Sequence, residues 1–255
     1  MNLVFASGFL VPQHILGIEY FRGLQAHVAA AHGYAVLFPE VPPIGNYEDR
    51  ARVLADAIAQ QYPDGAVHII AHSMGGLDSR TLIARNLQGL SNPGRIASLT
   101  TVSTPHLGSP VADLLAGPRP DGLRRLLYDG IAHAICLLGV DPGALANLTT
   151  EEASRVPDAA QTHPHIRYRS YFASGRPGTL PTCFAFAPTY HYIRTATGQE
   201  NDGFVTLDSA RYGEFQEPLW ACDHADAVGH NLDTGDLGGF QFDHFTAFDA
   251  IINQL

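Results

Sequence analysis

The chain has 255 residues, of which 45% are hydrophobic and 16% are charged. This composition excludes an intrinsically disordered protein, and the 25 glycines and 17 prolines, scattered without a period, exclude a collagen-like or low-complexity one. The formal net charge of −10 argues against binding to nucleic acid or to anionic membranes, because both need a basic surface. We also expect no integral membrane segment, since no stretch reaches the ~18 consecutive apolar residues of a membrane span.

The first part of the chain alternates short apolar runs with amphipathic stretches. This alternation is typical of βαβ units, in which helices connect the strands of a parallel sheet. The strands are predicted at Leu3–Ala6, Tyr34–Phe38, Val67–Ala71 and Ile96–Val102, and the helices between them at Tyr20–Ala31 and Tyr47–Gln61.

The second part of the chain begins with a region rich in Leu and Ala that is broken by Gly and Pro, which predicts short helices. We therefore interpret residues 1–255 as a single α/β domain that carries a helical insertion at residues 111–160. The elements predicted here are helices within Val111–Leu148, the longest at Leu123–Leu138, then strands at Ile166–Ala173 and near Phe184–Ile193, and a final helix at Phe240–Leu255.

The most specific motif is Ala71-His72-Ser73-Met74-Gly75, where an apolar strand runs into a helical stretch. A sharp strand-to-helix turn of this kind holds a nucleophilic serine in strained backbone geometry, and it needs the small flanking residues that Ala71 and Gly75 provide. The helix that follows directs its positive end toward Ser73. Ser73 is therefore the predicted nucleophile, and the alternative is a serine that only caps the helix.

A nucleophilic serine needs a base that takes its proton and a carboxylate that orients the base. On a scaffold with this turn, the acid and then the histidine follow the serine along the chain. His224 lies in a polar loop after a predicted strand, and His230 and His244 are alternatives, whereas His106 precedes most of the acidic candidates. Three further histidines lack a loop suited to a base: His163, His165 and His191.

Several blocks of sequence resemble one family in the same order and over nearly the whole chain. These blocks are Ser7–Leu10 with Ile15–Phe21, Ala71–Gly76, Thr104–Ser109 with Ala112-Asp113, Leu148–Ala153, and Asn201–Val205 with Tyr212-Gly213 and His224–Asp226. They are similar to the calcium-dependent bacterial triacylglycerol lipases of the Pseudomonas and Burkholderia type. The resemblance implies the α/β-hydrolase fold, with a mostly parallel central sheet flanked by helices and a helical insertion that resembles a lid.

The resemblance also implies a catalytic triad. In it Ser73 is the nucleophile, His224 is the general base and acid, and Asp202 is the carboxylate that orients the histidine. Because Asn, Asp and Gly are all turn formers, the Asp202 segment is alternatively a simple turn. In that case Asp208 or Asp233 would be the acid.

The resemblance implies an oxyanion hole formed by the backbone N–H groups of Phe9 and Met74. The chemistry then needs no cofactor. The family's structural calcium is held by two Asp side chains and by backbone carbonyls. Asp226 matches one of them, but residues 159–201 contain no Asp, so a calcium site is expected only if Glu200 or carbonyl groups compensate.

The implied function is hydrolysis of carboxylic esters through an acyl-enzyme, by a triacylglycerol lipase or carboxylesterase whose substrate is a lipid or another small acyl ester. The alternatives are an acyltransferase or a polyester hydrolase with the same triad, or a non-catalytic binding protein on this scaffold. The apolar residues of segment 111–160 are predicted either to form a lid over an acyl pocket or to be an ordinary buried helix face.

The three cysteines are too few and too dispersed for a disulfide framework. One pair, Cys183 and Cys222, could form a disulfide in an oxidising compartment. The first residues show no basic region or cleavage site, so a signal peptide is not predicted and a cytoplasmic location is compatible with the sequence, whereas the resemblance implies secretion. The sequence indicates no oligomeric state.

Overall fold

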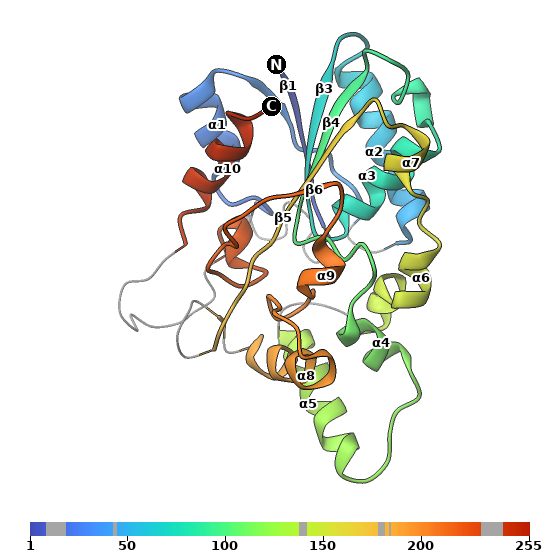
Figure 1. Ribbon diagram of the computed structural model, residues 1–255, viewed down its shortest axis with the longest axis vertical. Helices are drawn as coiled ribbons and strands as arrows, with labels where there is room; N and C mark the ends of the chain where they lie inside the picture. Colours follow the sequence, from blue (N-terminus) through green and yellow to red (C-terminus); the bar gives the residue numbers. More distant parts are fainter. Residues whose placement is uncertain (9–18, 43–44, 138–141, 178–181, 184, 231–241) are drawn as a thin grey trace.

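A computed structural model describes residues 1–8, 19–42, 45–137, 142–177, 182–183, 185–230 and 242–255 (Figure 1). Its strands form a six-stranded parallel sheet in the order β2-β1-β3-β4-β5-β6. This arrangement confirms the predicted fold class. The strands are β1 (Asn2–Ala6), β2 (Ala35–Leu37), β3 (Val67–His72), β4 (Ile96–Val102), β5 (Arg167–Tyr171) and β6 (Glu214–Phe215).

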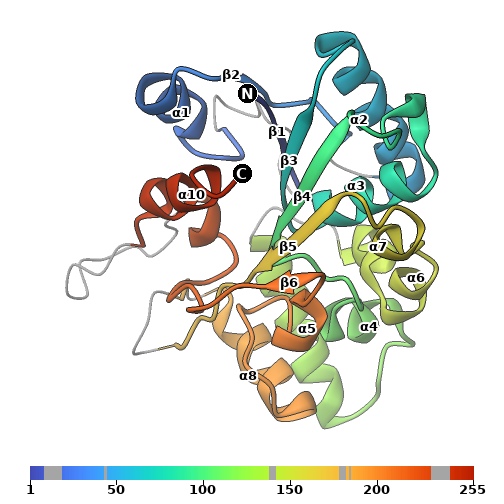
Figure 2. The ribbon, with the colours of Figure 1, turned by 45° about the horizontal axis from the view of Figure 1, so that its top comes forward.

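Helices cover both faces of the sheet, as Figures 1 and 2 show. Alternate residues of β1 point to opposite faces, so that Phe5 packs in the layer beneath α1 and α10, while Val4 packs in the layer beneath α2 and α3. Both layers are apolar, which explains why the central strands are nearly continuous hydrophobic runs. These helices are α1 (Leu24–His32), α10 (His244–Ile252), α2 (Tyr47–Gln61) and α3 (Gly75–Ala84).

Helices also gather at one end of the sheet, where Figures 1 and 2 show α4, α5 and α8 together. Leu115, Ile131 and Ile193 from these three helices form one apolar cluster with Met74, which follows β3. The short helices predicted in the middle of the chain are thus confirmed, while the limits of a separate insertion at 111–160 stay a prediction. The helices and turns are α4 (Pro110–Ala116), α5 (Leu123–Leu137), η3 (Pro142–Leu148), α6 (Thr150–Ser154), α7 (Ala159–Thr162), α8 (Ala187–Thr197), α9 (Leu207–Ala210), and the 3₁₀ turns η2 (Leu87–Gly89) and η4 (Asp226–Val228).

The prediction of a strand near Phe184–Ile193 is wrong, because this segment leads into helix α8. Phe184 itself lies outside the described residues. Aromatic and β-branched residues favoured a strand. Pro188 in the first turn and Gly198 after the last, with a φ of 71°, are instead typical helix boundaries. The buried residues of α8 follow the helical spacing: Thr189, Tyr190 and Ile193.

The disulfide that Cys183 and Cys222 could form is not present in the structure, where the two residues are buried thiols. Burial raises the pKa of the Cys222 thiol well above its ordinary value. The thiolate, which is the form that reacts to make a disulfide, is therefore disfavoured at this position. None of the helices among the described residues has the length and apolar character needed to cross a membrane.

Candidate active site

The turn between β3 and α3 places Ser73 at the carboxyl end of the sheet. Its φ of 56° lies in the left-handed region, and its N–H donates to the carbonyl of Val102 at 3.1 Å. Glycine is required beside it, because a Cβ on Gly75 would overlap the carbonyl oxygen of Ala6 and one on Gly76 would overlap the Thr104 side chain. The sequence thus folds here into the tight turn that the motif predicts.

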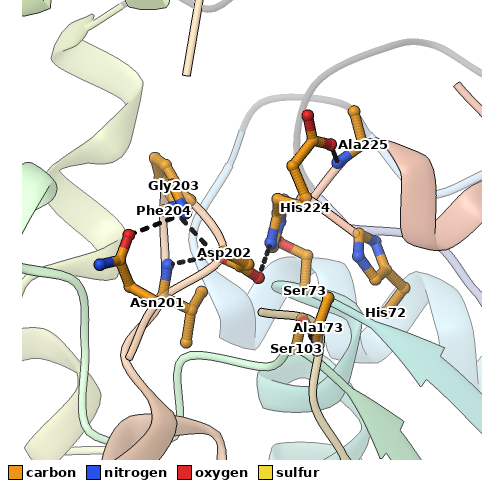
Figure 3. A network of polar contacts seen from close by, with 12 residues as sticks. His72, Ser73, Ser103, Ala173, Asn201, Asp202, Gly203, Phe204, His224 and Ala225 are labelled. Carbon is orange, nitrogen blue, oxygen red and sulfur yellow. Dashed lines mark hydrogen bonds and ion pairs between the residues drawn. The ribbon is translucent and has the colours of Figure 1, made fainter. Parts of the chain in front are cut away.

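Three side chains from distant parts of the chain meet at this turn (Figure 3). Ser73 Oγ lies 3.0 Å from His224 Nε2, and His224 Nδ1 lies 2.7 Å from Asp202 Oδ2. Asp202 is on the loop after α8, and His224 is on the loop after β6. All three side chains are buried, so that water does not compete for these contacts.

The Asp202 carboxylate is held by backbone donors as well as by His224. Its Oδ1 accepts hydrogen bonds from the N–H groups of Phe204 at 2.9 Å and Val205 at 2.7 Å. Gly203, with a φ of 92°, donates its N–H to Asn201 Oδ1 at 3.0 Å. The segment is therefore a turn, as its composition suggests, and the same turn presents the carboxylate to the histidine.

The alternative residues lie elsewhere. His230 Nε2 donates to the Tyr20 carbonyl at 2.7 Å, and His244 Nε2 donates to the Arg22 carbonyl at 2.8 Å. His106 is buried against Thr101 and Arg80. His165 contacts the Ser91 carbonyl, and His163 stacks edge-on with His165. His191 lies on α8 and Asp208 lies on α9. Asp233 is outside the described residues.

His72 is a neighbour of the site that the sequence did not single out. Its ring centroid lies 4.6 Å from that of His224 (Figure 3). Its Nδ1 lies 2.7 Å from the Tyr20 hydroxyl. Burial lowers the pKa of His72 well below its ordinary value, so this ring is neutral. Its place directly before Ser73 was the only available signal, and that signal does not reveal the contact with Tyr20.

The backbone near the expected oxyanion hole is held by a buried ion pair that was also not predicted. The Nη2 of Arg50 lies 2.8 Å from Asp78 Oδ2 and donates to the carbonyls of Ser7 at 2.9 Å and Gly8 at 3.1 Å. Because Asp78 is on α3, the pair fixes the end of β1 against the helix behind Ser73. Of the two expected oxyanion donors, Met74 is buried at the start of α3, and Phe9 lies outside the described residues.

The two side chains named for the implied calcium site have other partners in the structure. Asp226 is buried, with its Oδ2 3.5 Å from the Asp223 N–H. Glu200, the predicted substitute ligand, is instead paired with Arg194 and with the Ser174 hydroxyl. Calcium prefers roughly six to eight oxygen ligands. Among the residues that the structure describes, no group of three or more His, Cys, Asp or Glu side chains could hold a metal ion.

Comparison with known proteins identifies similar chains. A family model described as the α/β hydrolase fold matches residues 19–162. Triacylglycerol lipase 2 of Saccharomyces cerevisiae is 30% identical over 223 residues, which cover 84% of this chain and 64% of that protein. A triacylglycerol lipase of Vibrio cholerae is 25% identical over a region that covers 99% of this chain and 86% of that protein. This chain thus spans a little under two thirds of the yeast relative.

Solved structures show a similar fold. The mature Bacillus licheniformis lipase BlEst2 matches with a TM-score of 0.69 at 23% identity, over 98% of this chain and 91% of that one. The metagenomic carboxyl esterase MGS0156 matches with a TM-score of 0.73 at 18% identity, over 100% of this chain and 75% of that one. At these identities the likeness concerns the fold alone.

Proposed function

This chain belongs to the α/β-hydrolase fold family, and on that premise we propose that it is a serine hydrolase of carboxylic esters, a lipase or carboxylesterase. The observation that carries the proposal is the hydrogen-bonded set in which His224 Nε2 is 3.0 Å from Ser73 Oγ and its Nδ1 is 2.7 Å from Asp202. The triacylglycerol lipases among the relatives support an ester as the substrate.

The first half of the proposed reaction transfers the acyl group to Ser73. The Ser73 oxygen attacks the ester carbonyl carbon while His224 Nε2 takes the hydroxyl proton. Asp202 keeps Nδ1 of the imidazole protonated and stabilises the imidazolium that forms. The backbone N–H groups of Met74 and Phe9 bind the oxyanion, supported by the N-terminus of α3. His224 then gives its proton to the leaving alkoxide, and the alcohol departs.

The second half releases the acid. Water attacks the acyl carbonyl carbon while His224 takes its proton, and the same histidine returns that proton to the Ser73 oxygen as the ester bond breaks. An alcohol in place of water would give acyl transfer through identical steps. Analysis of the products in the presence of a competing alcohol therefore separates hydrolysis from transfer.

The substrate is proposed to be a lipid or another ester with an apolar acyl group. Met74, next to the nucleophile, belongs to a cluster with Val111, Leu115, Ile131 and Leu148 from the helices at the end of the sheet. Apolar side chains in this position would favour an apolar acyl chain over a charged one. Segment 111–160 is the lid that we propose for this substrate, within one domain of residues 1–255.

The test is the hydrolysis of p-nitrophenyl butyrate by Ser73→Ala and His224→Ala. Each variant should lose a factor of about 10⁴ or more in kcat, and the two losses should be similar because the residues act as a unit. Thr195→Ala, which removes an exposed hydroxyl on α8 outside the proposed lid, is the matched control and should keep the activity of the unmodified protein. Turnover that survives in Ser73→Ala would refute the proposal.

A further inference from the structure

Asp223, the residue directly before His224, has a buried carboxylate that accepts hydrogen bonds on both oxygens. Its Oδ1 accepts from the N–H groups of Ala225 at 2.8 Å and Asp226 at 2.9 Å. Its Oδ2 accepts from the N–H of Cys183 at 2.6 Å, across 40 positions of the chain. A buried carboxylate with several N–H donors is stabilised in its ionised form, which accepts hydrogen bonds and donates none.

The two bonds to Oδ1 fix the local path of the loop. They join Asp223 to the two residues that follow His224, so the histidine lies inside a turn closed by its neighbour's side chain. The His224 N–H in addition donates to the Asp202 carbonyl at 3.0 Å. Rotation of the His224 backbone would therefore break several hydrogen bonds at once.

The bond to Oδ2 connects this loop to the loop of the acid. The carbonyl of Cys183 accepts the N–H of Phe186 at 2.8 Å. Phe186 packs closely on Gly203, where an added Cβ would lie 2.8 Å from the Phe186 Cβ. Gly203 directly follows Asp202, so Asp223 is linked through this segment to the backbone that presents the carboxylate to His224.

We propose that Asp223 is a positioning residue that holds His224 where its ring contacts both Ser73 and Asp202. This inference rests on the proposed function. The imidazole must meet two partners, 3.0 Å from Ser73 Oγ and 2.7 Å from Asp202 Oδ2, and a small displacement of its backbone loses one of them. Such misplacement lowers the rate of the reaction without removing any reacting group.

Two variants of Asp223 distinguish the contributions of its hydrogen bonds. Asp223→Ala removes the hydrogen bonds to the N–H groups of Ala225, Asp226 and Cys183. Asp223→Asn keeps the size and one acceptor oxygen for Ala225 and Asp226, but its amide would present N–H groups to the N–H of Cys183. The asparagine variant thus tests the connection to Cys183 separately from the local turn, and it carries the test if the alanine variant does not fold.

A matched control is Asp243→Ala. Asp243 is likewise an aspartate whose side chain accepts a hydrogen bond where a loop meets a helix. Its Oδ1 lies 3.1 Å from the Thr246 N–H at the start of α10. Its removal lowers stability through a lost cap but leaves the site untouched. The single tryptophan, Trp220, reports folding of each variant by its fluorescence.

The experiment measures kcat and KM for p-nitrophenyl butyrate together with the downfield proton resonance of the His224 Nδ1–H that contacts Asp202. Asp223→Ala should lose about 100-fold in kcat with little change in KM, and the resonance should shift or disappear. Asp223→Asn should lie between Asp223→Ala and the unmodified protein. Asp243→Ala should keep both the kcat and the resonance.

Two results would overturn the proposal. One is a folded Asp223→Ala or Asp223→Asn protein with unchanged kcat and an unchanged resonance. The other is a fall in kcat with an unchanged resonance, because the contact between His224 and Asp202 would then be intact. Failure of the proposed function would look different, since Ser73→Ala would then remain active.

Discussion

At the scale of single residues, Ser73 combines the oxygen that we propose as the nucleophile with an unfavourable backbone conformation. A serine with a φ of 56° has a conformation that costs about 1–3 kcal/mol unless the residue is glycine. The surrounding structure imposes this conformation, since Gly75 lies against the Ala6 carbonyl and Gly76 against Thr104. The protein therefore keeps a strained serine in order to present its oxygen to His224.

This strain predicts a difference in stability between two variants that lack the Ser73 hydroxyl. Both Ser73→Gly and Ser73→Ala lose the contact with His224, but glycine relieves the left-handed conformation, whereas alanine keeps a Cβ. The free energy of unfolding of Ser73→Gly should be higher than that of Ser73→Ala by about 1 kcal/mol. Urea unfolding followed by Trp220 fluorescence measures both values. Equal stability of the two variants would show that Ser73 is not strained.

The residues of the site differ in how far the sequence could predict them. Ser73 has a local signal, because strand, small residues and helix all occur within one short segment. Asp202 and His224 have no such signal: His224 lies 151 positions from Ser73, and only the family resemblance singled out this pair. His72 and Arg50 were not predicted at all, since their contacts join segments that only the folded sheet brings together.

At the scale of elements, the contact between α1 and α10 includes one carboxylate and two histidines. Asp249 on α10 lies 2.9 Å from His27 Nε2 and 2.7 Å from His32 Nε2 on α1. Burial alone would raise the pKa of Asp249, but the hydrogen bonds from His32 and His27 outweigh it and lower the pKa below 3.8. The folded protein therefore favours the ionised form of Asp249.

The sign of this shift predicts a pH dependence of stability. A carboxylate whose pKa is lowered on folding stabilises the protein fully above its unfolded value, here 3.8, and this stabilisation is lost as the pH falls through the lower folded value. Asp249→Asn should therefore be less stable at pH 7, by under about 1 kcal/mol because the pair is partly exposed, and should lose less stability on acidification below pH ~4.

Thermal unfolding between pH 7 and pH 3 measures this effect. Asp64→Asn, which removes the same charge from an exposed turn after α2, is the control and should follow the unmodified protein. If the unfolding temperature of Asp249→Asn falls with pH as steeply as that of the unmodified protein, Asp249 does not have a lowered pKa in the folded protein.

The elements that sequence reasoning missed lack a clear local pattern of polar and apolar residues. The strand β6 spans only Glu214–Phe215, too short for any alternation of polar and apolar residues to appear. The segment at α8 carries residues that favour strands, and its helical state depends on its boundaries and on packing against α4 and α5. The long apolar strands β3 and β4 were predicted within one residue, since burial on both faces leaves a clear pattern.

At the scale of the whole molecule, the parallel sheet brings the site together. Ser73 follows β3, which lies between β1 and β4, so the turn is surrounded by the carboxyl ends of neighbouring strands. Loops at this edge are where open α/β sheets bind their ligands. The loops with Asp202 and His224 reach the same edge from the second half of the chain, and neither could be placed there from sequence spacing alone.

The central claim is that Ser73 is the nucleophile of an ester hydrolase, and mass spectrometry after reaction with a fluorophosphonate tests it most directly. Such a reagent forms a stable bond with an activated serine oxygen. We predict one adduct, located on Ser73, whose amount rises in proportion to the loss of p-nitrophenyl butyrate hydrolysis. An adduct on another residue that accounts for the loss of activity, or full hydrolysis by protein completely labelled at Ser73, would contradict the claim.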